Sequence, residues 1–350
     1  MTISDIHRKD SGMRESIGID LGADTIRVSS IEHGLMAVEP SLVAIDQRGY
    51  VFDLGNGALE ARERSSNVVI KRPFSRGILE NRAFTEYILS RIISALDKPL
   101  PAAVSVPASF SVEESDTLLS LMQKVGFPSA SLVPSPIAAM KGNTFSMDSD
   151  CIWVDIGAGT TDIALMLDGR LVFVQSIPVA GSQFDRAVAE YLAEKKNLRV
   201  APSAAETLKK RIGAAWDYWN DEPLGAPPEI RISGKSLDTG LDAVVSVSSI
   251  ELMEAFVETA DIIIRNICST LHRVPLNKVE SLFRNGIYLS GGGAMLKGFE
   301  RLVGKITGVP TTLVPQAADV VALGLARIGM LDPHDSSEAA QLSRCIIRHY

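Results

Sequence analysis

The sequence predicts an α/β fold that contains a duplicated domain. The main observation is a pair of similar hairpins, one at residues 17–28 and the other at residues 152–165. Each runs through an apolar strand, an Asp, an apolar residue, a Gly, a short polar loop and a second apolar strand. One such hairpin is often only a turn in β structure. Two copies, separated by roughly half the chain, predict two related halves.

The second hairpin carries the residues of a phosphate-binding loop. Gly157 and Gly159 let backbone N–H groups approach an anion closely, and Thr160 and Thr161 add hydroxyl donors. Asp155 stands where a carboxylate can hold a hydrated cation. The loop lacks both the Lys of a P-loop and the helix of a dinucleotide-binding turn. Its occurrence in both halves predicts a nucleotide between them.

Composition narrows the class of protein. The chain has 350 residues, 46% of them hydrophobic and 22% charged, which is typical of a globular protein with more than one domain. A net charge of −7 gives no general affinity for nucleic acid. The three cysteines, Cys151, Cys268 and Cys345, are too few and too widely spaced for a disulfide framework or a zinc site. No apolar run is long enough to span a membrane, and the first ten residues do not resemble a signal peptide, so we expect a cytoplasmic protein.

The elements of the first half follow from local patterns. After the first hairpin we expect a short strand at residues 39–45 and a small surface subdomain up to residue 64. Apolar residues at four-residue spacing predict a helix over residues 84–96, followed by a strand at residues 102–106. A capping box predicts the next helix, from Ser111 to Gly126. A further strand then turns into a helix at a proline, which places Ser135 at the strand end, where ligand-facing residues of α/β sheets lie.

The second half continues from its hairpin into a third strand at residues 170–177. Gly181 precedes a helix, so its N–H group is expected to bind an anion. A charged helix over residues 203–215, a pair of short strands and a long helix from about residue 249 follow. A strand then enters three glycines, Gly291–293, whose exposed backbone suits a flat ring or a phosphate. The last expected elements are a strand at residues 312–314 and a helix at residues 317–328.

Three motifs in this order resemble those of one superfamily. Residues 19–22, 155–162 and 290–293 look like the phosphate-one, phosphate-two and adenosine motifs of actin, DnaK-type chaperones and sugar kinases. Within this superfamily the chain most resembles the MreB family of bacterial actin-like cytoskeletal proteins, over about residues 15 to 330.

The resemblance implies an actin-like fold, with two ribonuclease-H-like domains around a nucleotide cleft and a small subdomain on each. The implied divisions are subdomain IA at 15–31, 76–148 and 315–331, IB at 32–75, IIA at 149–182 and 248–314, IIB at 183–247, and tails at 1–14 and 332–350.

The resemblance also implies ATP with Mg²⁺, head-to-tail filaments of the protein itself, and a role beneath the membrane with morphogenesis and cell-wall synthesis proteins. Gly22, Gly157, Gly159, Thr160 and Thr161 would hold the phosphates, Glu206 and Lys209 would meet the ribose, and Gly292, Gly293 and Met295 would border the adenine. The other implied cofactor-binding residues are Ala23, Asp24, Thr25, Ala158, Gly181, Lys210 and Gly291. Asp20 and Asp155 are expected to hold Mg²⁺ through water, and Ser135 and Thr161 to take the catalytic positions.

Several residues depart from the family pattern. Ser135 replaces the usual Glu that orients the attacking water, and a serine is no general base at neutral pH, so we expect slow or altered ATP hydrolysis. Asp24 adds an acid to the first loop and is expected to point away from phosphate or toward a metal. Ala158 replaces a glycine, which requires a negative φ at this position. Leu100 is the one apolar side chain in the loop at residues 97–101 that could touch a membrane, and the tail at residues 344–350 is a second candidate.

Three other functions are compatible with parts of the pattern. An organelle-positioning scaffold of the MamK type shares the second loop and would be distinguished by its cargo. A sugar-kinase-type phosphotransferase needs a catalytic Asp and larger insertions, neither of which is evident. A DnaK-type chaperone needs a peptide-binding domain after the ATPase, and the chain is too short for one.

Overall fold

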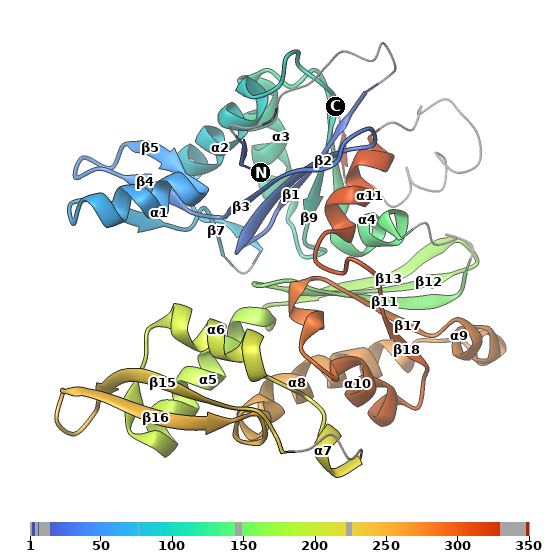
Figure 1. Cartoon of the computed structure of the whole chain (residues 1–350). Helices are drawn as coiled ribbons and strands as arrows, with labels where there is room; N and C mark the ends of the chain where they lie inside the picture. The colour runs from blue at the N-terminus through green and yellow to red at the C-terminus, as the bar shows by residue number, and fades with distance from the viewer. Residues whose placement is uncertain are drawn as a thin grey trace.

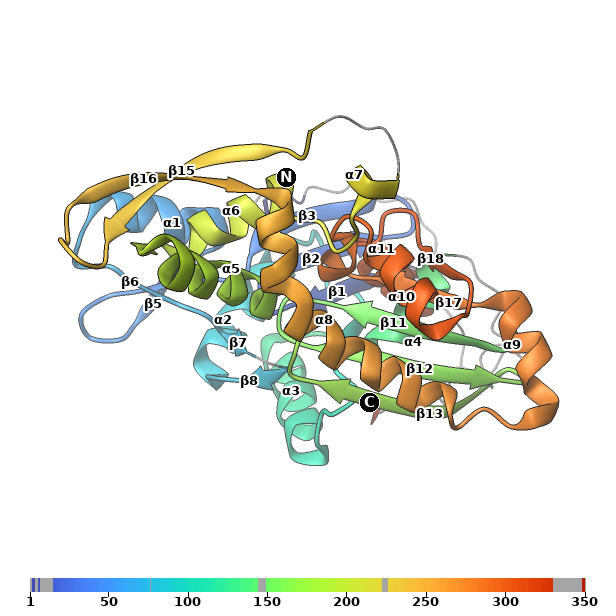
Figure 2. The ribbon, with the colours of Figure 1, turned by 90° about the horizontal axis from the view of Figure 1, so that it is seen from below.

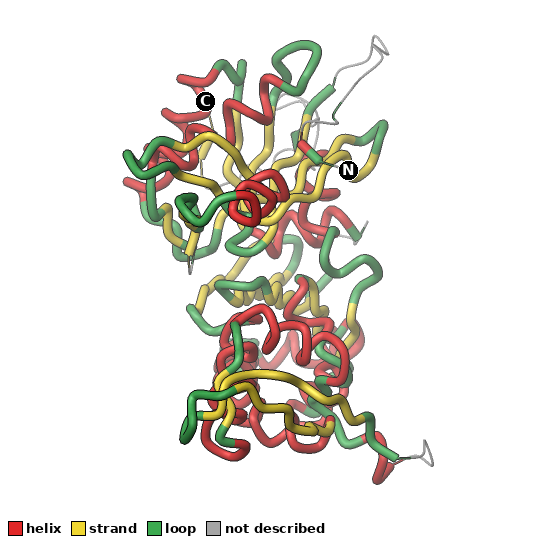
Figure 3. The backbone as a smooth tube through the Cα atoms, turned by 60° about the vertical axis from the view of Figure 1, so that its left-hand side comes forward, coloured by secondary structure: helices red, strands yellow, loops and turns green. Residues whose placement is uncertain are grey.

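The computed structural model describes residues 2–3, 6, 15–75, 77–143, 149–221, 226–329 and 348–349. Two central sheets divide the protein into a first half and a second half, which lie one above the other in Figures 1 and 3. The sheet of the first half has the order β19-β10-β9-β1-β2-β3. Its strands are β1 (Ile17–Leu21), β2 (Thr25–Ser30), β3 (Gly34–Pro40), β9 (Ala102–Val106), β10 (Ala130–Pro134) and β19 (Arg348–His349).

The sheet of the second half repeats the same core pattern. Its order is β13-β12-β11-β17-β18. Its strands are β11 (Cys151–Ile156), β12 (Thr161–Leu167), β13 (Arg170–Ile177), β17 (Ile287–Ser290) and β18 (Thr311–Leu313). In each half the first strand of the hairpin pairs antiparallel with the second and parallel with a later strand, β9 in the first half and β17 in the second. The predicted pair of hairpins is confirmed.

Helices cover the faces of both sheets. The first half uses α2 (Arg82–Ser94), α3 (Val112–Val125), α4 (Ser135–Gly142) and α11 (Val320–Ile328). The second half uses α5 (Gly181–Lys196), α6 (Pro202–Ile212), α8 (Ser249–Leu271), α9 (Val279–Asn285) and α10 (Phe299–Thr307). The long helix α8 lies across the five-stranded sheet (Figure 2). Capping boxes at Ser111 and Ser248 open α3 and α8 by satisfying free N–H groups in the first turn.

Each half also carries a smaller unit, and both units extend to the left in Figure 1. The first consists of β4 (Val43–Ile45), β5 (Val51–Leu54), β6 (Val69–Lys71) and α1 (Gly55–Arg64). The second consists of β14 (Leu198–Arg199), β15 (Glu229–Ser236) and β16 (Asp242–Ser248), beside α5 and α6. The remaining short elements are β7 (Phe74–Ser75), β8 (Ile78–Leu79), α7 (Tyr218–Asp221), η2 (Leu276–Lys278) and η3 (Gly292–Met295). The division into subdomains IA, IB, IIA and IIB remains a prediction.

One apolar cluster joins the two halves. It contains buried residues of α4 and α11 together with Trp153 of β11, whose ring stacks on Tyr288 at 5.3 Å. A Cβ on Gly324 would lie 1.7 Å from the Ala138 carbonyl oxygen, so α11 approaches α4 more closely than any side chain would permit. The halves therefore share a packed core at this place.

The structure differs from the sequence predictions at several points. The strand predicted at residues 39–45 is interrupted, because the Ser41 N–H donates to the Asp24 carbonyl instead of continuing the ladder. The charged helix ends at Ile212 because Gly213 has extended dihedrals. Ile3 is buried in the core of the first half, inside the segment expected to be a tail. At the other end of the chain, β19 pairs with β10, although the rest of residues 344–350 lies outside the described part.

The loop at residues 97–101 does not expose its apolar side chain. Leu100 is 4% exposed and packs in the core of the first half. The expectation that Leu100 faces a membrane is therefore wrong. Among the described residues, no helix is long and apolar enough to cross a membrane.

Candidate functional site

The two hairpin loops are tight turns, and the first requires glycine. In the first, a Cβ on Gly22 would lie 2.6 Å from the Thr25 carbonyl oxygen. In the second, the Gly157 N–H donates to the Thr160 carbonyl oxygen at 2.9 Å. Ala158 is not among the described non-glycine residues with positive φ. The negative φ that an alanine needs in place of a glycine is therefore present at this position.

The glycines after β17 have different roles. A Cβ on Gly291 would lie 2.2 Å from the Ile156 carbonyl oxygen, and one on Gly293 would lie 2.6 Å from Cγ2 of the same residue. Both glycines are therefore needed for packing against β11. A Cβ on Gly292 would meet nothing within 4 Å, so this residue alone borders open space. Met295, three residues on, is exposed. That these three glycines and Met295 border a ligand remains a prediction, and Gly292 is the one of the three whose Cβ direction is open.

Gly181 lies against the second loop. Its N–H donates to the Gly157 carbonyl at 3.0 Å, and a Cβ there would lie 3.5 Å from the Ala158 Cα. The expected free N–H at the start of α5 is thus already bonded to the protein. Gly181 supports the shape of the second loop and does not present a donor to an anion.

Asp155 and Asp20 end the first strands of the two hairpins and are buried or nearly so. Burial raises the pKa of Asp155 to about 7, opposed by the Ser290 hydroxyl, which donates to Oδ1 at 2.7 Å. Burial also raises the pKa of Asp20, which accepts from the Ser105 hydroxyl at 2.6 Å. The negative charges of Asp162 and Asp20 further raise the pKa of Asp155, so carboxylates from both halves lie near one another. Such a group of buried acids favours a bound cation.

Arg27 is a site residue that the sequence reasoning missed. Its guanidinium lies 3.9 Å from Asp20 Oδ2, and its Nε donates to Asp319 at 2.9 Å. The strand register was the available signal, because Asp20 and Arg27 are direct partners across the first hairpin. In the second hairpin the equivalent pair is Asp155 and Asp162. The first half thus holds a fixed positive charge where the second holds another acid.

Asp24 has a partner in its own half. Arg72 donates to Asp24 Oδ1 at 3.1 Å and to the Ala23 carbonyl at 2.8 Å. Asp24 therefore points toward a guanidinium, and its orientation relative to the phosphates remains a prediction. Thr25 follows as the first residue of β2.

The charged face of α6 meets the start of α5. Lys209 pairs with Asp185 at 2.7 Å and donates to the Gly181 carbonyl at 3.0 Å. Lys210 pairs with Glu206, which raises the pKa of this lysine, and the Asp24 carboxylate of the first half raises it further. The expected ribose residues thus lie within electrostatic reach of the first loop.

A comparison with protein families identifies the family of this chain. The family model described as MreB/Mbl protein matches residues 14–334. The chain belongs to the MreB/Mbl family. Among curated relatives, the cell shape-determining protein Mbl of Bacillus cereus is 30% identical over 318 residues, covering 88% of this chain and 93% of that protein. The cell shape-determining protein MreB of Escherichia coli is 28% identical over 343 residues, covering 93% and 97%.

Solved structures confirm the actin-like fold. MreB5 of Spiroplasma citri bound to AMPPNP matches with a TM-score of 0.81 at 23% identity, covering 90% of this chain and 95% of that one. The MamK double helical filament matches with a TM-score of 0.76 at 19% identity, covering 92% and 100%. The fold class predicted from the hairpins is therefore correct.

The two residues expected to be catalytic, Thr161 and Ser135, differ in burial in this MreB/Mbl protein. Thr161 is buried, and its hydroxyl donates to the Val179 carbonyl at 2.7 Å. In this structure its hydroxyl proton is therefore used within the protein, and its catalytic position remains a prediction. Ser135 begins α4 and is half-buried, so its side chain remains accessible at the strand end. Thr160, beside the second loop, is also partly exposed and donates to Asp162 at 3.2 Å.

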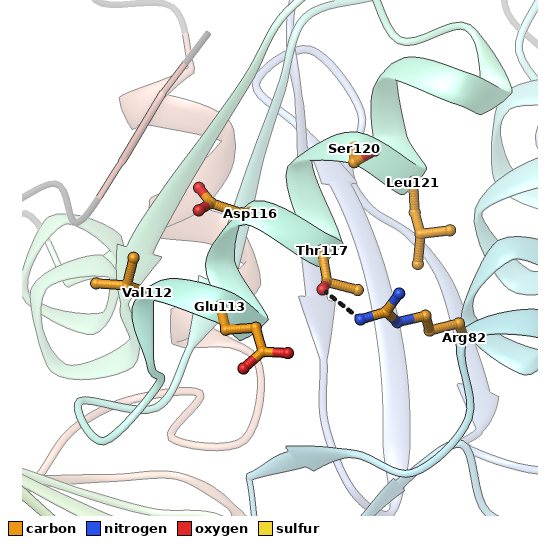
Figure 4. Close-up of a pocket in the computed structure, with 7 residues that line it drawn as sticks. All are labelled: Arg82, Val112, Glu113, Asp116, Thr117, Ser120 and Leu121. Atoms are coloured by element: carbon orange, nitrogen blue, oxygen red, sulfur yellow. Dashed lines mark hydrogen bonds between the residues drawn. The ribbon is translucent and has the colours of Figure 1, made fainter.

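A pocket of about 550 Å³ lies elsewhere, on the outer surface of the first half. Figure 4 shows Arg82, at the start of α2, pointing toward Thr117 of α3, to which it donates at 3.2 Å. The other lining residues are Val112, Glu113, Asp116, Ser120 and Leu121 of α3. None belongs to the hairpin loops or to the glycine motif, so this pocket is separate from the candidate site.

Proposed function

We propose that this MreB/Mbl protein binds ATP between its halves and assembles with copies of itself into filaments that help to determine cell shape. The observation that carries the proposal is that Asp20 and Asp155 of the two glycine-bearing hairpins interact electrostatically, while Gly293 packs against Gly157 and its neighbour Gly292 borders open space. The family match adds support, as do the AMPPNP- and ADP-bound structures of MreB5, which has the same fold.

The residues present fit a hydrated Mg²⁺. Asp20 and Asp155 are buried acids with raised pKa values, and each already accepts one serine hydroxyl. In the described residues no group of three or more His, Cys, Asp or Glu is placed to hold a metal directly, so contact through water is the arrangement we propose. When bound, Mg²⁺ would neutralise phosphate charge.

A substitution at Gly292 tests nucleotide binding. Valine at position 292 fills the open space without meeting protein atoms within 4 Å at its Cβ, so we expect a folded protein that has lost at least about tenfold in ATP affinity. The measurement is equilibrium dialysis with labelled ATP and Mg²⁺. Gly304→Ala is the matched control, because its Cβ makes only ordinary contacts at 3.6 Å or more. Equal affinity in both variants and the parent would contradict the proposed position of the nucleotide.

We also propose that hydrolysis is slow. Ser135 holds the accessible position at the start of α4 and offers no carboxylate to orient water. ATP would then act mainly through binding and assembly.

The proposed site of action is the cytoplasmic face of the membrane, with morphogenesis and cell-wall synthesis proteins as partners. The names of the curated relatives support a role in cell shape. An organelle scaffold of the MamK type is the second candidate, supported only by likeness of fold. Complementation of a shape-defective strain separates the two: restored rod shape supports the first, and normal filaments without any shape change support the second.

A further inference from the structure

Asp162 of β12 bonds directly to the other half of the molecule. Its Oδ1 accepts the backbone N–H of Ala108 at 2.7 Å. Ala108 follows β9 in the first half, whereas Asp162 stands at the start of β12 in the second. The Asp162 side chain is 2% exposed, so this charge-assisted bond is shielded from water.

The other oxygen of Asp162 bonds to the second hairpin loop. Thr160 Oγ1 donates to Asp162 Oδ2 at 3.2 Å. Backbone from the first half also contacts this threonine: a Cβ on Gly77 would lie 3.1 Å from Thr160 Cγ2 and 2.7 Å from Pro107 Cγ. Gly77, with φ of +78°, therefore fits between Thr160 and the segment that contains Ala108.

A hydroxyl group has only one proton to donate. Thr160 can give it to Asp162, as in this structure, or to an anion held by the second loop, but not to both. Binding of a phosphate at the loop would therefore change the bonding of Asp162, and with it the strength of the bond from Ala108.

We propose that Asp162 is a positioning residue that links occupancy of the second loop to the contact between the two halves at Ala108. The inference rests on the proposed nucleotide binding, and it says how that binding would alter the contact between the two halves. It involves no covalent step. The coupling consists of one side chain that bonds to both sides of the interface.

Hydrogen exchange measured by mass spectrometry tests this link, with peptides covering residues 106–111 followed in the absence and presence of Mg²⁺-ADP and Mg²⁺-AMPPNP. In the parent protein we expect nucleotide to change exchange at Ala108 by about fivefold or more. Asp162→Ala should raise basal exchange there and remove the nucleotide response, measured at nucleotide concentrations that parallel dialysis shows to saturate the variant.

Asp162→Asn is the more selective variant. Its amide oxygen can still accept from Ala108, but its NH₂ group can only donate toward Thr160. Basal protection at Ala108 should therefore persist while the nucleotide response is lost. This variant retains the side-chain shape, so it also tests the idea if the alanine variant does not fold.

Asp150→Ala is the matched control. Asp150 is also a buried acid of the second half that accepts a backbone N–H, from Asp168 at 2.8 Å, but the bond stays within that half. Its variant should keep the response at Ala108. A response that persists in Asp162→Asn and Asp162→Ala would overturn the inference and leave the proposed function intact. A parent protein that binds no nucleotide in parallel dialysis would overturn both.

Discussion

Asp20 and Asp155 hold equivalent places in the two halves, but their surroundings differ. Asp20 faces Arg27, while Asp155 faces a second acid, Asp162. Burial, together with the charges of Asp162 and Asp20, raises the pKa of Asp155 to about 7, and burial raises that of Asp162 to about 6. A bound cation would therefore be stabilised most by the carboxylates of the second half.

Replacing Ser135 tests the assignment of slow hydrolysis. Ser135→Glu places a carboxylate at the accessible start of α4, and a positioned base typically contributes two or more orders of magnitude, so phosphate release should rise at least about tenfold. The readout is phosphate release with saturating Mg²⁺-ATP. Ser135→Gln matches the glutamate in size and should stay at the parent rate; an equal rise in both variants would contradict a role for the charge.

The two described cysteines should differ in reactivity. Burial raises the pKa of Cys151 to about 12, whereas Cys268 is partly exposed. Since the thiolate is the reactive form, iodoacetamide at pH 8 should modify Cys268 while Cys151 stays largely unmodified until the protein is unfolded. Peptide mass spectrometry after timed labelling measures both sites. Rapid labelling of Cys151 in the native protein would show that β11 is not buried as described.

At the scale of elements, the hairpins and most helices could be predicted because their signals are local: alternation, four-residue spacing, and capping boxes such as the one at Ser111. The features that could not be predicted depend on contacts between residues that are distant in sequence. Ser41 leaves its strand to bond Asp24, and the Gly181 N–H is taken by Gly157. No local pattern reveals that a predicted donor already has a partner.

The loop at residues 97–101 gives a test at this scale. Because Leu100 is buried in the core of the first half, Leu100→Ala should lower the free energy of unfolding by about 3 kcal/mol. Binding to anionic vesicles should not change. Denaturant unfolding and vesicle flotation measure the two quantities. Unchanged stability together with weaker flotation would restore the membrane role that the structure excludes for this side chain.

For the whole molecule, the duplication and the meeting of the two loops were predictable, because the same motif occurs in both halves. The contacts between the halves were not. The bond from Ala108 to Asp162 and the apolar cluster that packs Trp153 of β11 with residues of α4 and α11 join segments separated by tens to hundreds of residues. Such contacts follow from tertiary packing and have no signature in a single sequence.

Self-assembly gives a prediction at the same scale. The turn between β15 and β16 and helix α9 lie at opposite ends of the second half (Figures 1 and 2). Leu241 in this turn is 70% exposed, and Leu276, the first residue of η2 just before α9, is 93% exposed. Leu276→Asp should raise the critical concentration for assembly at least about tenfold, because a buried charge without a partner is costly. Val112→Asp, on the exposed start of α3, is the control for added charge. Equal effects of both substitutions would argue against end-to-end contact at Leu276.

The most direct test of the central claim is sedimentation of the purified parent protein over a range of concentrations, with Mg²⁺-ATP, Mg²⁺-ADP or no nucleotide, and with electron microscopy of the pellets. We predict filaments above a critical concentration that is lowest with ATP, and little phosphate released during assembly. A protein that binds ATP but stays monomeric at every concentration, under all three conditions, would contradict the account.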